Sequence, residues 1–217
     1  MHRWKLYIFL FTLSAALVCL ISCSGSDIDE SAIPEGDKGP VITDGIFSPG
    51  EWEDAKAVVI NENLTMYLKH YGDVFYIGLK CPEFKMPVSD MFISPDGSEI
   101  YQFHISAQLG EIKLNQEGQD DPEWEFGNTS GWYGNEIRWN YAKANELVAQ
   151  GMDNVEANVS VSTPHEGHEY AFRKDKFSST NLLIRFEMMY VGHYDKPLIY
   201  PQDTRMKNTS GWMKISF

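Results

Sequence analysis

The alternation of apolar and polar residues is the feature that most constrains how this chain of 217 residues folds. It recurs in five segments: 64–69, 74–80, 155–162, 184–188 and 213–217. A period of two places one face of a strand against a core and the other face in water. Turn residues separate these segments, as at 71–73, 95–97 and 195–197. The pattern therefore predicts an all-β fold, an antiparallel β-sandwich.

Three other segments depart from the alternation. We expect one or two helical turns at 49–55, and residues 141–150 could form a second helix. Residues 115–135 are too polar and too rich in glycine to belong to a core. We therefore interpret them as a long functional loop.

The N-terminus has the build of a secretory signal. His2, Arg3 and Lys5 precede an apolar run over residues 6–21. The run ends in Leu20-Ile21-Ser22-Cys23, which resembles the lipobox of bacterial lipoproteins. That resemblance implies that residues 1–22 are removed and that Cys23 is acylated, which would anchor the chain in a membrane. An uncleaved membrane helix is the alternative, because the run is close to the shortest length that spans a bilayer.

The residues after Cys23 indicate where the anchored protein would be. Residues 23–40 are rich in Ser, Gly, Pro and acid, which predicts a flexible acidic tether. Residues 41–217 remain as one domain. The early acids resemble the export signal of surface lipoproteins in Bacteroidetes-like bacteria. We expect a lipid-anchored protein of the bacterial outer membrane, and the cell surface and the periplasm both stay open as the face it occupies.

The charge balance excludes one class of partner. The chain carries 18 Lys and Arg against 31 Asp and Glu, a net charge of −13. Nucleic-acid binding needs clustered basic residues, so we expect no nucleic-acid partner. Carboxylates suit calcium, and a structural calcium ion is the cofactor that the sequence leaves open. Its candidate ligands are Asp90, Asp96, Asp120 and Asp121.

Several short motifs, in order along the chain, resemble the family 9-like carbohydrate-binding modules. They are Asp44-Gly45 with Glu51-Trp52 and Ala55, the strand at 73–79, the strand and acidic turn at 90–97, the Glu-initiated edge strand at 169–172, and the closing Trp strand at 212–215. The resemblance implies a two-sheet sandwich of the DOMON-like or immunoglobulin-like jelly-roll type, and carbohydrate as the ligand. The family's acid is missing beside Met91-Phe92, and residues 116–154 have no counterpart.

The aromatic loop supplies the candidate binding residues. Sugar rings stack their C–H faces on flat aromatic side chains, while their hydroxyl groups need polar partners. The candidates are Trp124, Asn128, Trp132, Tyr133 and Arg138. Packing of these aromatics against the sandwich is the alternative. Asp44-Gly45 and Trp52 are expected to serve structure.

Two other functions remain open at this stage. DOMON-type haem domains use Met with His or Lys, and His70, His104 and His193 are available here. A structural envelope lipoprotein is the other alternative.

Residues 165–169 resemble a solvated hairpin turn more than a metal motif. The sequence contains no nucleophile elbow, phosphate loop or zinc spacing, so no catalytic activity is expected, although a role beside glycoside hydrolases stays open.

Overall fold

The computed structural model describes residues 32–81, 88–115, 117, 119–127, 129–162, 165–189, 191 and 196–217. The predicted signal segment, Cys23, Asn128 and His193 lie outside the described residues.

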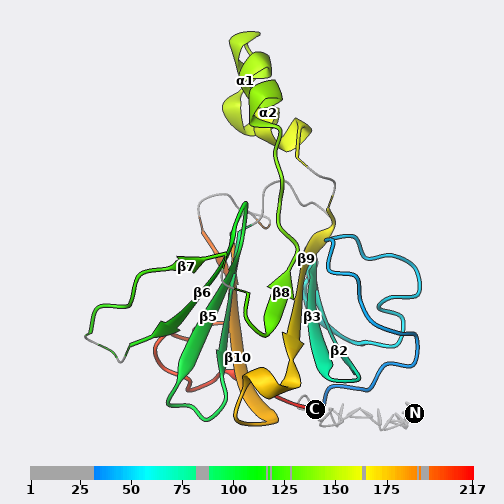
Figure 1. The fold of residues 1–217 in the computed structure, drawn as a ribbon, viewed down its shortest axis with the longest axis vertical. Coiled ribbons are helices and arrows are strands. Elements are labelled where there is room, and N and C mark those ends of the chain that lie inside the picture. The colour runs from blue at the N-terminus through cyan, green and yellow to red at the C-terminus, as the bar shows by residue number, and fades with distance from the viewer. Residues whose placement is uncertain are drawn as a thin grey trace, which may run out of the picture.

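Two antiparallel sheets face each other and form a sandwich (Figure 1). The first has the strand order β1-β2-β3-β9-β8, and the second has the order β11-β10-β4-β5-β6-β7, with β12 pairing to β10. The strands of the first sheet are β1 (Lys56–Asn61), β2 (Leu64–Tyr71), β3 (Val74–Lys80), β8 (Trp132–Gly134) and β9 (Gly167–Arg173). Those of the second are β4 (Ser89–Ser94), β5 (Ile100–Ile105), β6 (Leu109–Leu114), β7 (Glu125–Phe126), β10 (Asn181–Met188), β11 (Leu198–Tyr200) and β12 (Met213–Ser216). The predicted all-β sandwich is confirmed.

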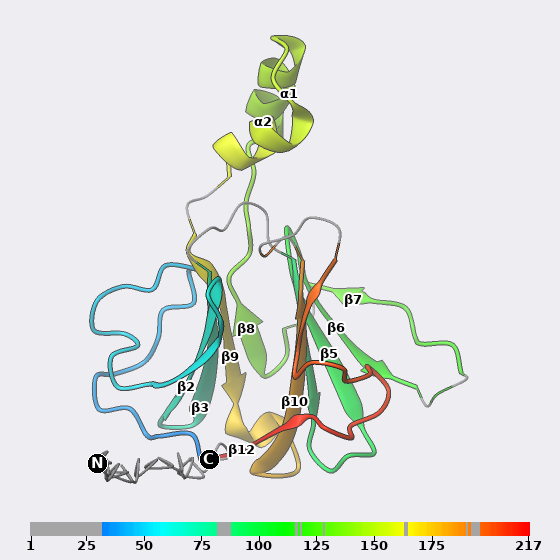
Figure 2. The same ribbon diagram turned by 180° about the vertical axis from the view of Figure 1, so that it is seen from behind.

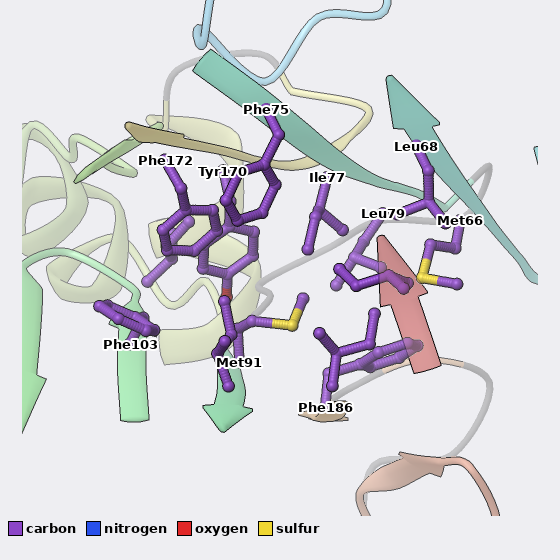
Figure 3. Packing of buried hydrophobic residues seen from close by; sticks show 14 of the residues in the cluster. Met66, Leu68, Phe75, Ile77, Leu79, Met91, Phe103, Tyr170, Phe172 and Phe186 are labelled. Carbon is purple, nitrogen blue, oxygen red and sulfur yellow. The ribbon is translucent and has the colours of Figure 1, made fainter. Parts of the chain in front are cut away.

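The inner faces of the two sheets form an aromatic and aliphatic core (Figure 3). Phe103 on β5 meets Phe172 on β9 edge to face, with ring centroids 4.9 Å apart. Trp132 on β8 lies 5.1 Å from Phe103 and 6.1 Å from Phe172, and only 4% of Trp132 is exposed. Edge-to-face contacts of this kind stabilise a core beyond the apolar area they bury.

The chain that leads into β1 packs on both sheets. Val41, Phe47 and Trp52 cover the outer face of the first sheet around Tyr76, and residues 32–36 reach the main core and β2. Ala32 forms a parallel bridge with Ser216, and Ile33 is 4% exposed within the main core. Glu35 bridges His70 on β2, and the backbone N–H of Gly36 donates to the His70 carbonyl at 2.7 Å. The predicted flexible tether is therefore wrong for residues 32–36, because Ile33 provides apolar area that the core can bury.

The outer face of the second sheet is only partly covered. A second apolar cluster lies there, composed of Phe92, Ile100, Ile112, Leu114 and Trp212. Arg185 on β10 is buried beside it, where its guanidinium donates to Glu187 at 2.5 Å and to the Thr204 hydroxyl at 3.1 Å. Segment 201–212 provides this cover through Met206 and Trp212, whereas Phe126 on β7, at the end of the strand order, is 54% exposed.

Two helices, α1 (Tyr141–Ala149) and α2 (Asn154–Ser160), form a helical arm beyond one end of the sandwich (Figure 2). They pack mainly on each other, and an isolated bridge between Trp139 and Ser162 closes the base. The predicted strand at 155–162 is wrong. Asp153 and Glu156 form a helix start, in which the Asp153 carboxylate accepts from the Glu156 N–H at 3.2 Å. Neither helix, within the part of the chain that is described, is long and apolar enough to cross a membrane.

Two further expectations need correction. Residues 49–55 form successive turns in place of a helix, because Gly50 adopts a φ of 94° and the chain closes only single i to i+3 hydrogen bonds, such as Ala55 N–H to the Trp52 carbonyl. Strand β9 is not an edge strand, because β8 pairs along its outer side. The predicted helix at 141–150 is confirmed as α1.

Truncation of Trp132 tests its place in the core. We expect Trp132→Ala to lower the free energy of unfolding by about 3–5 kcal/mol, because a large cavity would open between Phe103 and Phe172. Urea unfolding followed by fluorescence measures this. Tyr133→Ala, one residue along on the opposite face of β8, is the matched control and should cost far less, since Tyr133 is 45% exposed. Equal losses would contradict the placement.

Candidate functional site

The predicted sugar-binding residues do not gather at one place. Trp124 lies next to β7 on the outer face of the second sheet, and Tyr133 lies on the outer face of the first sheet. Arg138 is exposed at the base of the helical arm, 3.6 Å from Glu136. Trp132 is enclosed in the core, so its ring has no free face for a sugar. These four residues therefore cannot form a single binding site.

Trp124 instead pairs with Phe126, and we call these two rings the aromatic platform. Their planes are inclined by 21° and their centroids are 5.8 Å apart. Phe126 is 54% exposed, whereas Trp124 is half-buried against the outer cluster. Both rings lie directly over Gly110 of β6, where an added Cβ would lie 3.1 Å from each of them. The missing side chain at position 110 lets both rings approach the backbone of β6.

A row of polar side chains crosses the sheet toward this platform. Neighbouring strands pair Glu187 with Asp90, Asp90 with His104, His104 with Gly110, and Gly110 with Phe126. Residues opposite each other on paired strands point to the same side of a sheet. We call Glu187, Asp90 and His104 the polar row, and it shares the outer face with the platform.

His104 joins the polar row to the platform. Its Nδ1 lies 2.8 Å from the Asp90 carboxylate, and its Nε2 lies 2.9 Å from the Ser106 hydroxyl. Its ring centroid is 5.5 Å from that of Trp124 and 6.3 Å from that of Phe126. Asp90, Ser106 and the platform therefore fix the position of the imidazole ring. The side chain stays 19% exposed to solvent.

The sequence patterns pointed to the loop that contains Phe126 but not to Glu187 or Gly110, and to His104 only as a haem ligand. The alternation in 90–94 and 100–105 indicates which side chains of these two segments face outward. If Met91 and Phe103 point inward, then Asp90 and His104 point outward, and a hairpin at 95–99 would pair them.

A hollow lies on the outer face of the first sheet beside Tyr133. It has a volume of about 270 Å³ and is lined mainly by Val74, Trp132, Tyr133, Ala171 and Arg173. Only one exposed ring faces it, and Arg173 is bound to the carboxylate of Asp175. This hollow has fewer polar partners than the polar row provides.

The carboxylates proposed for calcium lie apart. Asp90 and Asp96 are at opposite ends of β4, and the Asp96 carboxylate accepts from the Ser98 and Glu99 N–H groups of its own turn. Asp121 is paired with Lys207 at 2.8 Å. Over the described ranges, no group of three or more His, Cys, Asp or Glu side chains could hold a metal ion. His70 and His104 lie in different sheets.

Three motif residues of the sequence resemblance, Asp44, Gly45 and Trp52, contact the buried carboxylate of a fourth, Glu169. It accepts from the backbone N–H groups of Asp44 and Gly45 at 3.0 and 2.8 Å, and from the Trp52 indole N–H at 2.9 Å. An added Cβ at Gly45 would lie 2.5 Å from the Asn135 amide nitrogen, which explains the glycine. The expectation that 44–45 and Trp52 serve structure agrees with this contact set, whereas the expectation of a solvated turn is wrong for His168 and Glu169, which are buried.

Burial raises the pKa of the Glu169 carboxyl to about 7, although the hydrogen bonds from Gly45 and Trp52 act in the opposite direction. Burial also holds the pKa of His168 well below its usual value, and the His168 ring lies between the sheets against Ser89. Both groups are enclosed, so they bear on the stability of the fold more than on contact with a ligand.

Comparison with known proteins gives few relatives. No protein-family model and no curated protein sequence matches the chain. A family 9 carbohydrate binding module from Caldicellulosiruptor kristjanssonii, solved in complex with cellotriose, is 10% identical over 86% of this chain and 92% of its own, with a TM-score of 0.45. A candidate carbohydrate-binding protein from Bacteroides uniformis ATCC 8492 is 11% identical over 75% of this chain and 84% of its own, with a TM-score of 0.39.

The raised pKa of Glu169 predicts a pH dependence of stability. Folding favours the protonated carboxyl, so its contribution is complete below pH 4.5 and is lost as the pH rises through about 7. The stability of the wild type relative to Glu169→Gln should therefore fall by about 3 kcal/mol over this range. Urea unfolding at a series of pH values measures it. Glu166→Gln, at a carboxylate that is 49% exposed, is the matched control, and a pH-independent difference for Glu169→Gln would contradict the assignment.

Proposed function

We propose that this chain binds carbohydrate on the outer face of the second sheet, at the aromatic platform and the polar row. One observation carries the proposal: an exposed Phe126 ring, stacked on Trp124, adjoins a line of side chains able to hydrogen-bond to hydroxyl groups. The resemblance of the sequence motifs to family 9-like carbohydrate-binding modules supports the same ligand class.

The chemistry of the face suits a sugar ring. The apolar C–H face of a pyranose would lie on Phe126, and its hydroxyl groups would reach toward the polar row. The side chains of Asp90 and Glu187 remain 22% and 30% exposed, so their carboxylate oxygens can accept from hydroxyl donors. Gln102 lies one row further along β5. The site is an open face, which suits a chain of sugars better than a small buried ligand.

We also propose that the protein is a lipoprotein of the bacterial cell envelope, anchored through Cys23. The support is the sequence alone, namely the apolar run, the Leu-Ile-Ser-Cys ending and the acidic segment that follows it. A tether ahead of the sandwich would hold the binding face away from the membrane while confining it to the surface. Glycan binding is the role that we assign to the platform.

Removal of the exposed ring tests the platform. We expect Phe126→Ala to weaken glycan binding about tenfold, because stacking on a ring face contributes on the order of 1–2 kcal/mol. A screen against an array of neutral and acidic oligosaccharides identifies the ligand, and calorimetry then measures the affinity. The melting temperature should change little, since the ring is 54% exposed.

Three further variants distinguish the aromatic platform from the hollow beside Tyr133 and from the helical arm as the place where the glycan binds. Trp124→Ala should weaken binding at least as much, at some cost in stability. Tyr141→Ala removes a 61% exposed ring from the helical arm and serves as the control with unchanged affinity. If Tyr133→Ala weakened binding while Phe126→Ala did not, the hollow on the first sheet would be the site. Failure of the wild type to bind any oligosaccharide would overturn the proposal.

The anchor has an independent test. Cys23→Ala should prevent incorporation of labelled palmitate and should leave the protein unprocessed or in the soluble fraction, because the acylated thiol would be absent. Metabolic labelling followed by membrane fractionation measures both effects. Cys81→Ala is the matched control at a thiol buried in the core. Retention of the palmitate label by Cys23→Ala would rule out this anchor.

A further inference from the structure

Asp90, His104 and Ser106 form a continuous hydrogen-bonded chain on the outer face of the second sheet. The Asp90 Oδ1 atom lies 2.8 Å from His104 Nδ1, and His104 Nε2 lies 2.9 Å from Ser106 Oγ. Asp90 is directly opposite His104 on the paired strand, and Ser106 follows two residues after His104, on the same side of the chain. We propose that these three residues form a serine hydrolase relay that cleaves carboxylic esters.

The hydrogen bonds set the direction of proton transfer. In the neutral imidazole the His104 proton lies on Nδ1, because the Asp90 carboxylate can only accept, and Nε2 is left as an acceptor. The Ser106 hydroxyl then donates to Nε2, which is the arrangement that makes a serine oxygen nucleophilic. The Ser106 Oγ is also held by the backbone N–H of Gln108 at 3.3 Å, and it lies 3.4 Å from the Gln108 carbonyl. The contact with His104 is the shortest of the three.

The position of Ser106 suits attack on a bound substrate. It is the first residue of the link 106–108 between β5 and β6, so its hydroxyl is at the end of a hairpin. The backbone N–H of Ala107 has no hydrogen-bond partner within the described part of the chain, and it follows the nucleophile directly. Such an N–H is a donor for the oxyanion that forms during acyl transfer. A single donor favours esters over amides, which have a poorer leaving group.

The reaction is balanced with water as the second substrate. Ser106 Oγ attacks the ester carbonyl carbon while its proton passes to His104 Nε2. The bond between the acyl carbon and the alcohol oxygen then breaks, and His104 returns the proton to that oxygen. Water attacks the acylated Ser106 in the same way, which releases the carboxylic acid and restores the serine. Asp90 is a positioning residue that holds the imidazole.

The neighbouring platform indicates the alcohol part of the ester. The rings of Trp124 and Phe126 lie beside His104, so a ring carrying an acyl group could stack there with its ester near Ser106. An O-acylated sugar fits this arrangement. That choice of alcohol rests on the proposed carbohydrate binding, whereas the relay itself does not. The sequence predicted no catalysis because the three residues belong to no short motif, and only the β4–β5 pairing brings Asp90 to His104.

A fluorophosphonate probe and p-nitrophenyl acetate test the relay on the full purified chain. We expect one covalent adduct per chain, located on Ser106 by peptide mass spectrometry. Ser106→Ala should abolish the adduct and lower kcat/KM at least about a hundredfold. Asp90→Asn should lower kcat with little change in KM or melting temperature, because the imidazole can then adopt the other tautomer. A change in stability alone would mark Asp90 as merely structural.

The control is Ser98→Ala, at a serine whose hydroxyl donates to Asp96 in the turn between the same two strands. This variant should keep both the adduct and the rate. Absence of an adduct on Ser106, or hydrolysis that persists in Ser106→Ala through another histidine, would overturn the proposal. Because p-nitrophenyl acetate carries no sugar, its result is separate from glycan binding by the wild type, which calorimetry measures on the same preparation.

Discussion

The need to bury the inner faces of two sheets determines which side chains this protein presents to solvent. Because strand residues alternate, the inward positions of Met91, Phe103 and Leu109 oblige Asp90, His104 and Gly110 to face outward. The pairing of the strands then aligns these outward residues into one row. A shift of one residue in the register of β5 would turn the His104 side chain toward the core, and the polar row would no longer form. The candidate site therefore depends on the register of the core.

The sequence predicted the parts of this fold in which one local pattern dominates. Strands β2, β3, β10 and β12 follow directly from their alternation, as does the sandwich to which they belong. The segment at 155–162 shows why alternation can mislead: a short helix forms there although its apolar residues recur at every second position, and the Asp153 carboxylate caps its start through the Glu156 N–H. The sequence also left open whether Trp132 faces the core or the solvent, since an aromatic residue in a short strand flanked by Gly131 and Gly134 can face either side. Only its pairing with Phe172 turned it inward.

The candidate site was harder to predict than the fold because the residues that build it come from five strands, β4, β5, β6, β7 and β10. Trp124 and Phe126 are close in sequence, and the first of them was selected as a binding residue. Asp90, Glu187 and Gly110 join them only through pairings across the sheet, which no local pattern reveals. Among the motifs that resemble a carbohydrate-binding family, residues 44–45, Trp52 and Glu169 form buried contacts with one another at the first sheet. The motif at 90–97 belongs to the second sheet and contributes Asp90 to the candidate site.

The helical arm has a consequence for how such a chain can vary. Its two ends meet at the bridge between Trp139 and Ser162, and its helices pack mainly on each other. A segment with adjacent ends can be lengthened, shortened or exchanged without altering the order of the strands. The connection between β8 and β9 is thus a natural insertion point, at which this sandwich can host an added module and keep its core intact.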